Sequence, residues 1–120
     1  MHAVIETAPY LRAAEHAGLT EDERADIITL VAINPDLGDI IPGTGGCRKA
    51  RIPGRGRGKS GGYRLITFYS GAGVPVFLLT VFGKGEKANL SGVEKHALAK
   101  LTKMLVASLT EKIVPMRMRR

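Results

Sequence analysis

The sequence contains a single cysteine, no long apolar run and, over a large central segment, no acidic residue. One cysteine, Cys47, excludes a disulfide within the chain and is typical of a reducing compartment, so we expect a cytoplasmic protein. The longest apolar stretches, such as residues 74–82, are about half the length that a membrane-spanning helix needs. The first residues lack a basic start followed by an apolar core, so we expect no secretory signal.

Acidic residues are absent between residues 40 and 85, although this segment contains eight lysines and arginines. By contrast, residues 1–39 contain eight acidic and two basic residues, and the whole chain has a net charge of +7. Solvated surfaces usually mix both signs of charge. The acid-free segment therefore predicts a polyanionic partner, which is nucleic acid in the first place and an anionic membrane or an acidic protein in the second.

The chain is long enough for one domain, and its N-terminal third is typical of a short strand and two helices. We expect the strand over residues 3–6 and the first helix over 8–17, ended by Gly18. Thr20 and Glu23 form a capping-box pattern that begins the second helix, and Asn34-Pro35 ends it.

The remaining chain predicts three strands and a final helix, after a loop over residues 35–46. The expected strands cover 47–52, 63–69 and 75–82 and are joined by glycine-rich connections. A second capping box, Ser91 with Glu94, begins a helix of about five turns with one apolar stripe, and residues from about 115 to 120 form a frayed tail. This order predicts a single α+β domain over 1–120, a mostly antiparallel sheet with the helices on one face.

A phosphate-binding loop of the nucleotide hydrolases is excluded, although Gly58-Lys59-Ser60 resembles the end of one. That loop needs a glycine where this chain has Pro53, and a helix where strand-like sequence follows Gly61-Gly62. The three histidines have no cysteine or carboxylate partner at ligand spacing, and the basic half has no paired carboxylates. We therefore expect no metal, no cofactor and no glycosidase-like chemistry.

The basic residues of the predicted strands could converge on one face of the sheet. Lys49 and Arg51 are two apart in one strand and so share a face, and Arg64 opens the next strand. Lys84 ends the strand after that. Converging cations repel one another, and they persist where a polyanion binds or where a lysine must accept a proton. The alternative is that these cations lie at strand ends and point to water.

Three segments resemble one known family. They are NPDLGDIIPGTGGCRKARI, GRGRGKSGGYRLITFY and PVFLLTVFGKGEKANLS, which together with the flanking elements cover nearly the whole chain. They are similar to the RelE/HigB-type toxins of bacterial toxin–antitoxin modules, most of all to the HigB-like branch. The resemblance implies the RelE-like fold, an N-terminal strand and two helices followed by a three-stranded antiparallel meander and a C-terminal helix.

The resemblance also implies an activity, a metal-independent endoribonuclease or mRNA interferase. Such toxins enter the ribosomal A site, cut the translated mRNA there by attack of a 2′-OH on the adjacent phosphate, and stop translation. No cofactor is implied. The implied partners are the ribosome, the mRNA and a cognate antitoxin, which binds the toxin in an oligomer.

Carried over by position, the family's roles fall on the basic residues of the strands. Lys49 is the implied general base, Arg51 the next cation on its face, Arg64 the phosphate clamp, and Lys84 a proton donor or charge stabiliser. The residues expected to contact RNA without reacting are Arg48, Arg55, Arg57 and Lys59, together with Tyr69 and Lys87.

The chain departs from the family's prototypes at two places. They have an arginine where this chain has Gly85 and an aromatic residue where it has residues 89–91. The proton donor is therefore open between Lys84, Lys87 and Tyr69. Two other functions also remain open, a non-catalytic basic module that binds nucleic acid and a ParE-like toxin directed at DNA gyrase. The acidic N-terminal third and the last helix are the surfaces expected to meet the antitoxin.

Overall fold

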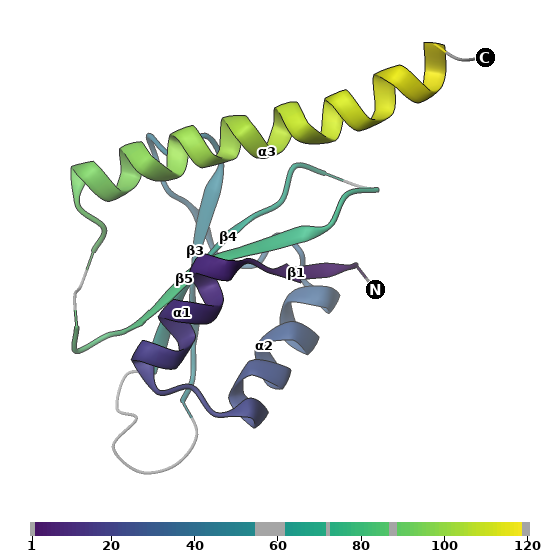
Figure 1. Ribbon diagram of the computed structural model, residues 1–120. Helices are drawn as coiled ribbons and strands as arrows, with labels where there is room; N and C mark the ends of the chain where they lie inside the picture. Colours follow the sequence, from purple (N-terminus) through teal and green to yellow (C-terminus); the bar gives the residue numbers. More distant parts are fainter. Residues whose placement is uncertain (1, 55–61, 72, 87–88, 119–120) are drawn as a thin grey trace.

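A sheet with helices on both faces is formed by the residues that the computed structural model describes, which are 2–54, 62–71, 73–86 and 89–118 (Figure 1). The elements in chain order are β1 (Val4–Glu6), α1 (Ala8–Ala17), α2 (Glu21–Ile33), β2 (Asp39–Ile40), β3 (Cys47–Ile52), β4 (Tyr63–Phe68), β5 (Val76–Gly83) and α3 (Gly92–Met118).

The strands lie in the order β1-β5-β4-β3-β2. The predicted meander is confirmed, because β3, β4 and β5 pair antiparallel in succession. β1 pairs parallel with β5 on the outer side of the meander. β2 extends the other edge and was not predicted, because its two residues, Asp39 and Ile40, lie in a segment rich in proline and glycine.

The predicted helix ends are confirmed by their hydrogen bonds. In α2, the Glu23 amide donates to the Thr20 hydroxyl at 3.1 Å, and the Thr20 amide donates to the Glu23 carboxylate at 3.0 Å. Gly18 ends α1 with a φ of 80°, a left-handed conformation that glycine adopts without strain. The Ser91–Glu94 box at the start of α3 has the same two bonds, at 2.8 and 3.1 Å.

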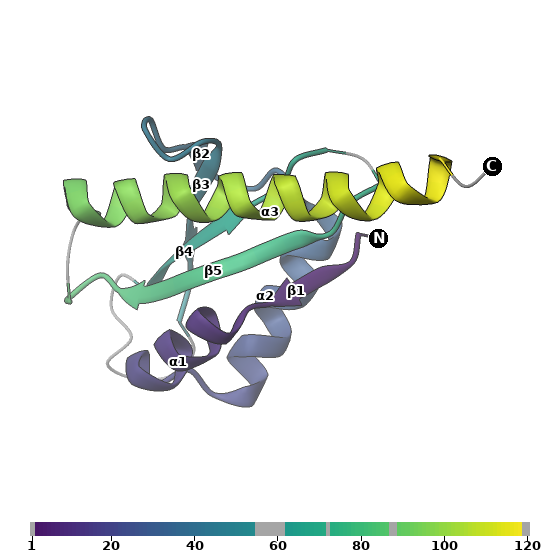
Figure 2. The ribbon, with the colours of Figure 1, turned by 45° about the horizontal axis from the view of Figure 1, so that its top comes forward.

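The expectation that the helices share one face of the sheet is wrong. α1 and α2 cover one face, which we call the α1–α2 face, and α3 covers the other, the α3 face (Figure 2). The reason lies in β4, whose six residues are all buried, and in β5, most of whose residues are buried. A strand that is apolar on both sides needs a cover on both sides.

α3 has 27 residues and continues to Met118, into the segment expected to fray. Its apolar stripe packs on the sheet as predicted, through the leucines at positions 98, 101, 105 and 109. Met104, whose spacing also fits the stripe, is instead 67% exposed. None of the described helices is long and apolar enough to span a membrane.

Candidate functional site

The side chains of β3 alternate between the two faces of the sheet. Ala50 and Ile52 belong to the core under α1 and α2, whereas Cys47 belongs to the core under α3. Because successive residues of a strand point to opposite faces, Lys49 and Arg51 share the α3 face with Cys47. The expected common face of the two cations is therefore the face that α3 covers.

Arg64 lies on the same face, directly across from Arg51. The two are register partners between β3 and β4, and Phe82 on β5 is the partner of Arg64 on its other side. Arg51 is exposed, whereas Arg64 is only 9% exposed and its Nη1 donates to the Tyr63 carbonyl at 3.4 Å. Like charges directly across a ladder destabilise a sheet, so this pair indicates a surface shaped for an anion. We call Lys49, Arg51 and Arg64 the cationic cluster.

Lys84 lies at the same end of the sheet as Arg51 and Arg64. Its amide donates to the Gly62 carbonyl at 3.3 Å, just before β4 begins, and its side chain is exposed. Gly62 has a φ of 60°, and a Cβ there would collide with the Ile52 carbonyl oxygen. The glycine of the GGYR segment therefore allows the close approach that brings the ends of β3, β4 and β5 together.

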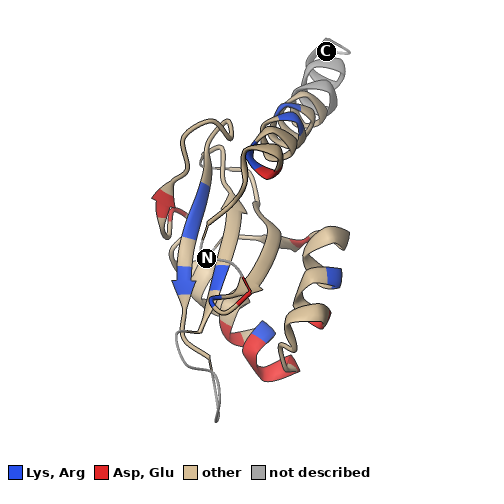
Figure 3. Ribbon diagram, turned by 90° about the vertical axis from the view of Figure 1, so that its left-hand side faces the viewer, with Lys and Arg blue, Asp and Glu red and all other residues tan. Residues whose placement is uncertain are grey.

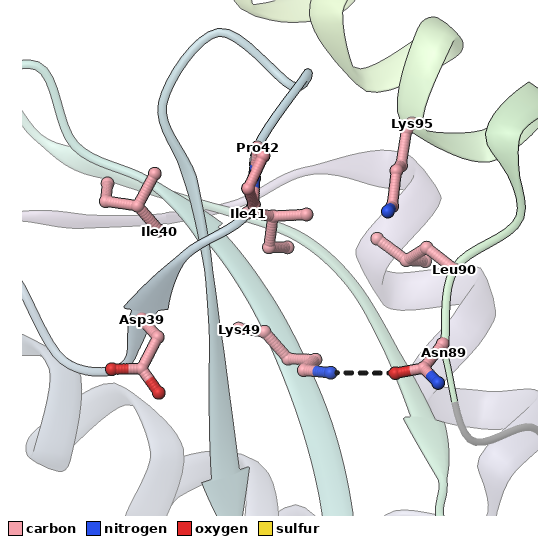
Figure 4. A pocket seen from close by; sticks show the side chains of 8 residues that line it. All are labelled: Asp39, Ile40, Ile41, Pro42, Lys49, Asn89, Leu90 and Lys95. Carbon is pink, nitrogen blue, oxygen red and sulfur yellow. Dashed lines mark hydrogen bonds between the residues drawn. The ribbon is translucent and has the colours of Figure 1, made fainter.

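Lys49 lies at the wall of a pocket between β3 and the start of α3. Its Nζ donates to the Asn89 Oδ1 at 3.3 Å (Figure 4). The pocket has a volume of about 320 Å³, and we call it the β3–α3 pocket. Its lining residues are Asp39, Ile40, Ile41, Pro42, Lys49, Asn89, Leu90 and Lys95.

The glycine-rich loop before β3 anchors α3 beside this pocket. The buried hydroxyl of Thr102 on α3 donates to the Thr44 carbonyl at 3.0 Å, and the Thr44 hydroxyl donates to the Ile41 carbonyl at 2.7 Å. Gly45 has a φ of 78°, and a Cβ there would collide with the Thr102 Oγ1. The GTGG sequence therefore fixes the loop that supplies Ile41 to the pocket wall and holds the helix that supplies Lys95.

Cys47 contributes packing rather than reactivity. It is fully buried, its amide donates to the Thr44 hydroxyl at 3.1 Å, and burial raises the pKa of its thiol to about 11. A thiol with that pKa is neutral at pH 7 and is a poor nucleophile.

Two of the expected RNA contacts lie away from the cationic cluster. Tyr69 follows the far end of β4 and packs against the core under α1 and α2, and its hydroxyl lies 3.0 Å from the His2 Nε2. The Arg48 guanidinium donates to the Gly38 carbonyl at 2.9 Å, beside β2. The other expected contacts, Arg55, Arg57, Lys59 and Lys87, lie outside the described residues.

The structure adds two residues to the site that the sequence did not indicate. Asn89 was noted only as a departure from the family pattern, and it is the hydrogen-bond partner of Lys49. Lys95 lies outside the apolar stripe of the last helix, yet it lines the β3–α3 pocket. The sequence contained one indication of this position. Lys95 directly follows the Ser91–Glu94 capping box and therefore lies in the first turn of α3.

The charges of the molecule differ between its elements. α2 carries four acidic residues and one basic residue, whereas the charged residues of β3 and β4 are all basic. Figure 3 shows both signs of charge on the two N-terminal helices and basic positions on the strands. Within the part of the chain that the structure describes, no group of three or more His, Cys, Asp or Glu side chains could hold a metal ion. The cationic cluster offers side chains that can bind phosphate and stabilise negative charge.

The structure thus defines a small α+β protein with a cationic cluster on one face of its sheet. The family model of the RelE toxin of the RelE / RelB toxin–antitoxin system matches residues 4–119. The chain belongs to this toxin family, which implies a cognate antitoxin as partner.

Proposed function

We propose that this chain is an mRNA-cleaving toxin that acts in the ribosomal A site and stops translation. The observation that carries the proposal is the cationic cluster, in which Lys49, Arg51 and the buried Arg64 share one face of the sheet. Membership of the RelE toxin family supports an RNA backbone as the anion that the cluster binds.

In the proposed reaction the Lys49 amine takes the proton of a ribose 2′-OH. The 2′-oxygen then attacks the adjacent phosphorus and the bond from phosphorus to the 5′-oxygen breaks, which leaves a 2′,3′-cyclic phosphate and a 5′-OH. Arg64 binds the phosphate oxygens through its planar guanidinium, and Arg51 adds a second positive charge beside it. Lys84, at the same end of the sheet, donates the proton to the leaving 5′-oxygen.

The branch of the family, the cellular compartment and the antitoxin surface are part of the same proposal. The glycine- and arginine-rich segment before β4 supports the proposal of the HigB-like branch, and its cations Arg55, Arg57 and Lys59 are proposed to contact the message or ribosomal RNA. The toxin works in the cytoplasm, where ribosomes translate. A cognate antitoxin neutralises it by contacts with α1 and the acidic helix α2, or with α3, and alanine changes on those helices should weaken neutralisation.

The test is to induce the chain in a bacterium without its neighbouring gene and to map the 5′ ends of cellular mRNA. The proposal predicts new ends in phase with codons, and only in messages that are translated. Growth arrest with intact mRNA would instead support a ParE-like toxin directed at gyrase. Normal growth with intact mRNA would support a non-catalytic basic module.

A further inference from the structure

The β3–α3 pocket combines two kinds of wall. Ile40, Ile41 and Pro42 make an apolar wall, and Leu90 lies opposite, between Lys95 of α3 and Asn89, the hydrogen-bond partner of Lys49 (Figure 4). Small-ligand pockets combine mostly apolar walls with a few placed polar groups, and their volumes begin at about 300 Å³. A nucleotide has the matching division into a flat, largely apolar base and an anionic phosphate.

Lys95 is held in place by the start of α3. The Ser91–Glu94 capping box fixes the first turn, the Lys95 amide donates to the Ser91 carbonyl at 3.0 Å, and the half-buried side chain points into the pocket. The neighbouring carboxylate of Glu94 is occupied by the Ser91 amide at 2.8 Å. Among the described residues, no ion pair within 4.0 Å neutralises Lys49 or Lys95.

The polar groups of the pocket are placed to suit a nucleotide. Lys49 is shared between the pocket and the cationic cluster, so a ligand in the pocket lies next to the proposed reaction site. Asp39, the register partner of Lys49 on β2, lies beside the apolar wall, where its carboxylate can accept from an amino group of a base. The Asn89 carboxamide, which lies beside Leu90, can donate and accept.

We propose that the β3–α3 pocket is a nucleotide subsite, in which Lys95 binds the phosphate next to the one that is cleaved. The apolar wall holds the base of the same nucleotide. This inference rests on the proposed function, because it names the part of the substrate that lies beside the reacting bond. It makes Lys95 a substrate contact on α3, the element that otherwise serves to cover the sheet.

The first arm of the test measures cleavage of a defined message in a reconstituted translation reaction. Lys95→Ala should lower kcat/KM by about 10- to 100-fold, the loss of one charge-assisted contact. Lys95→Arg keeps the charge and should stay within about threefold of the parent. Lys100→Ala, an exposed lysine on the same helix outside the pocket, is the matched control and should change nothing. Thermal melting of all variants verifies that α3 is intact.

The second arm measures binding of a short single-stranded RNA whose 2′-hydroxyls are methylated, so that it cannot react. Lys95→Ala should weaken its binding about tenfold relative to Lys100→Ala. Equal loss in both variants, or no loss in either, overturns the subsite even if the parent cleaves mRNA. A parent that binds through Lys95 but never cleaves overturns the proposed function and leaves the subsite standing.

Discussion

The two faces of the sheet differ in how completely their helices cover them. On the α1–α2 face, Ile52, Tyr63 and Leu65 continue the apolar core to the end of the strands. On the α3 face, the core includes Cys47 of β3 and Ile66 of β4, and the next positions toward that same end are cations. One face of the sheet is thus apolar to the end of the strands, whereas the other changes from apolar core to the cationic cluster along β3 and β4.

This difference shows how a small domain can keep repelling cations together. Apolar packing on both faces holds β3 and β4 in register, and that register places Arg51 opposite Arg64. The burial of apolar side chains elsewhere in the protein offsets the repulsion between these cations, because each fully buried leucine or isoleucine contributes about 1.5–3 kcal/mol to stability. We therefore expect changes on the α3 face to affect function and changes on the α1–α2 face to affect stability.

The largest expected effect is on catalysis at the cationic cluster. Lys49→Ala and Arg64→Ala should each lower the cleavage rate by about 10²- to 10⁴-fold, because each removes a group that the proposed mechanism assigns to the reacting atoms. Single-turnover cleavage of a translated message measures this. Arg12→Ala, an exposed arginine on α1, is the control and should cleave at the parental rate. A Lys49→Ala protein as toxic as the parent would remove the site assignment.

The next effect is on stability at the opposite face. Leu65→Ala removes a fully buried side chain from the core under α1 and α2 and should lower the free energy of unfolding by about 2–5 kcal/mol. Chemical denaturation monitored by circular dichroism measures this. The matched control is Leu11→Ala, since Leu11 is 39% exposed, and it should cost less than about 1 kcal/mol. A similar cost at both sites would mean that this face is not the main core.

The loss of stability at alkaline pH tests one buried ionisable group on each face of the sheet. Burial raises the pKa of Tyr10, on the α1–α2 face, to about 12, and that of Cys47, on the α3 face, to about 11. The unfolded chain loses these protons near pH 10 and 9, before the folded chain does, so stability falls as the pH rises from 9 to 11. The expected loss is about 2–4 kcal/mol in denaturant titrations.

The variants Tyr10→Phe and Cys47→Ala should each remove one part of this pH dependence. The comparison uses the difference between pH 8 and pH 11 within each variant, so that the packing cost of the change cancels. An unchanged difference in both variants would show that these two groups do not ionise on unfolding as described.

A smaller effect is expected at the partner of Lys49. Asn89→Asp places a carboxylate within hydrogen-bonding distance of the Lys49 amine and beside the incoming phosphate, which it repels. The cleavage rate should fall about three- to tenfold. Ser70→Asp, an exposed position beyond the far end of β4, adds the same charge away from the site and is the control. Equal effects of the two changes would indicate a general response to charge.

The smallest effect is expected at Tyr69. Tyr69→Phe removes the hydroxyl that lies 3.0 Å from the His2 Nε2 and should lower stability by about 0.5–1.5 kcal/mol. Cleavage should stay within about twofold of the parent, because Tyr69 packs against the α1–α2 core. A fall of tenfold or more in cleavage would indicate that Tyr69 is the proton donor. It would also contradict the assignment of catalysis to the α3 face and of stability to the α1–α2 face.

The helices and the longer strands could be predicted because the chain marks them locally. Thr20 with Glu23 and Ser91 with Glu94 mark helix starts, and the glycine at position 18 marks a helix end. The order of the layers was harder to predict, because the sequence of a buried strand such as β4 does not indicate on which face each helix packs. The apolar run in β5 was the available sign that both faces are covered.

The candidate site could be predicted only where it follows from strand alternation and register. Lys49, Arg51 and Arg64 satisfy this condition, since a period of two and one hairpin place them together. Asn89 is 40 residues from Lys49, and only the path of the chain after β5 brings the two together. Lys95 has the spacing of a solvated helix position, and its place in the pocket depends on how α3 packs.

The most direct test of the account is to identify the RNA ends that the purified protein produces. The measurement compares one message bound in the ribosomal A site with the same message free in solution. The account predicts cleavage of the ribosome-bound message alone, with a 2′,3′-cyclic phosphate and a 5′-OH at the cut, and none by the Arg64→Ala protein. An intact ribosome-bound message, or a cut that leaves a 5′-phosphate, would contradict it.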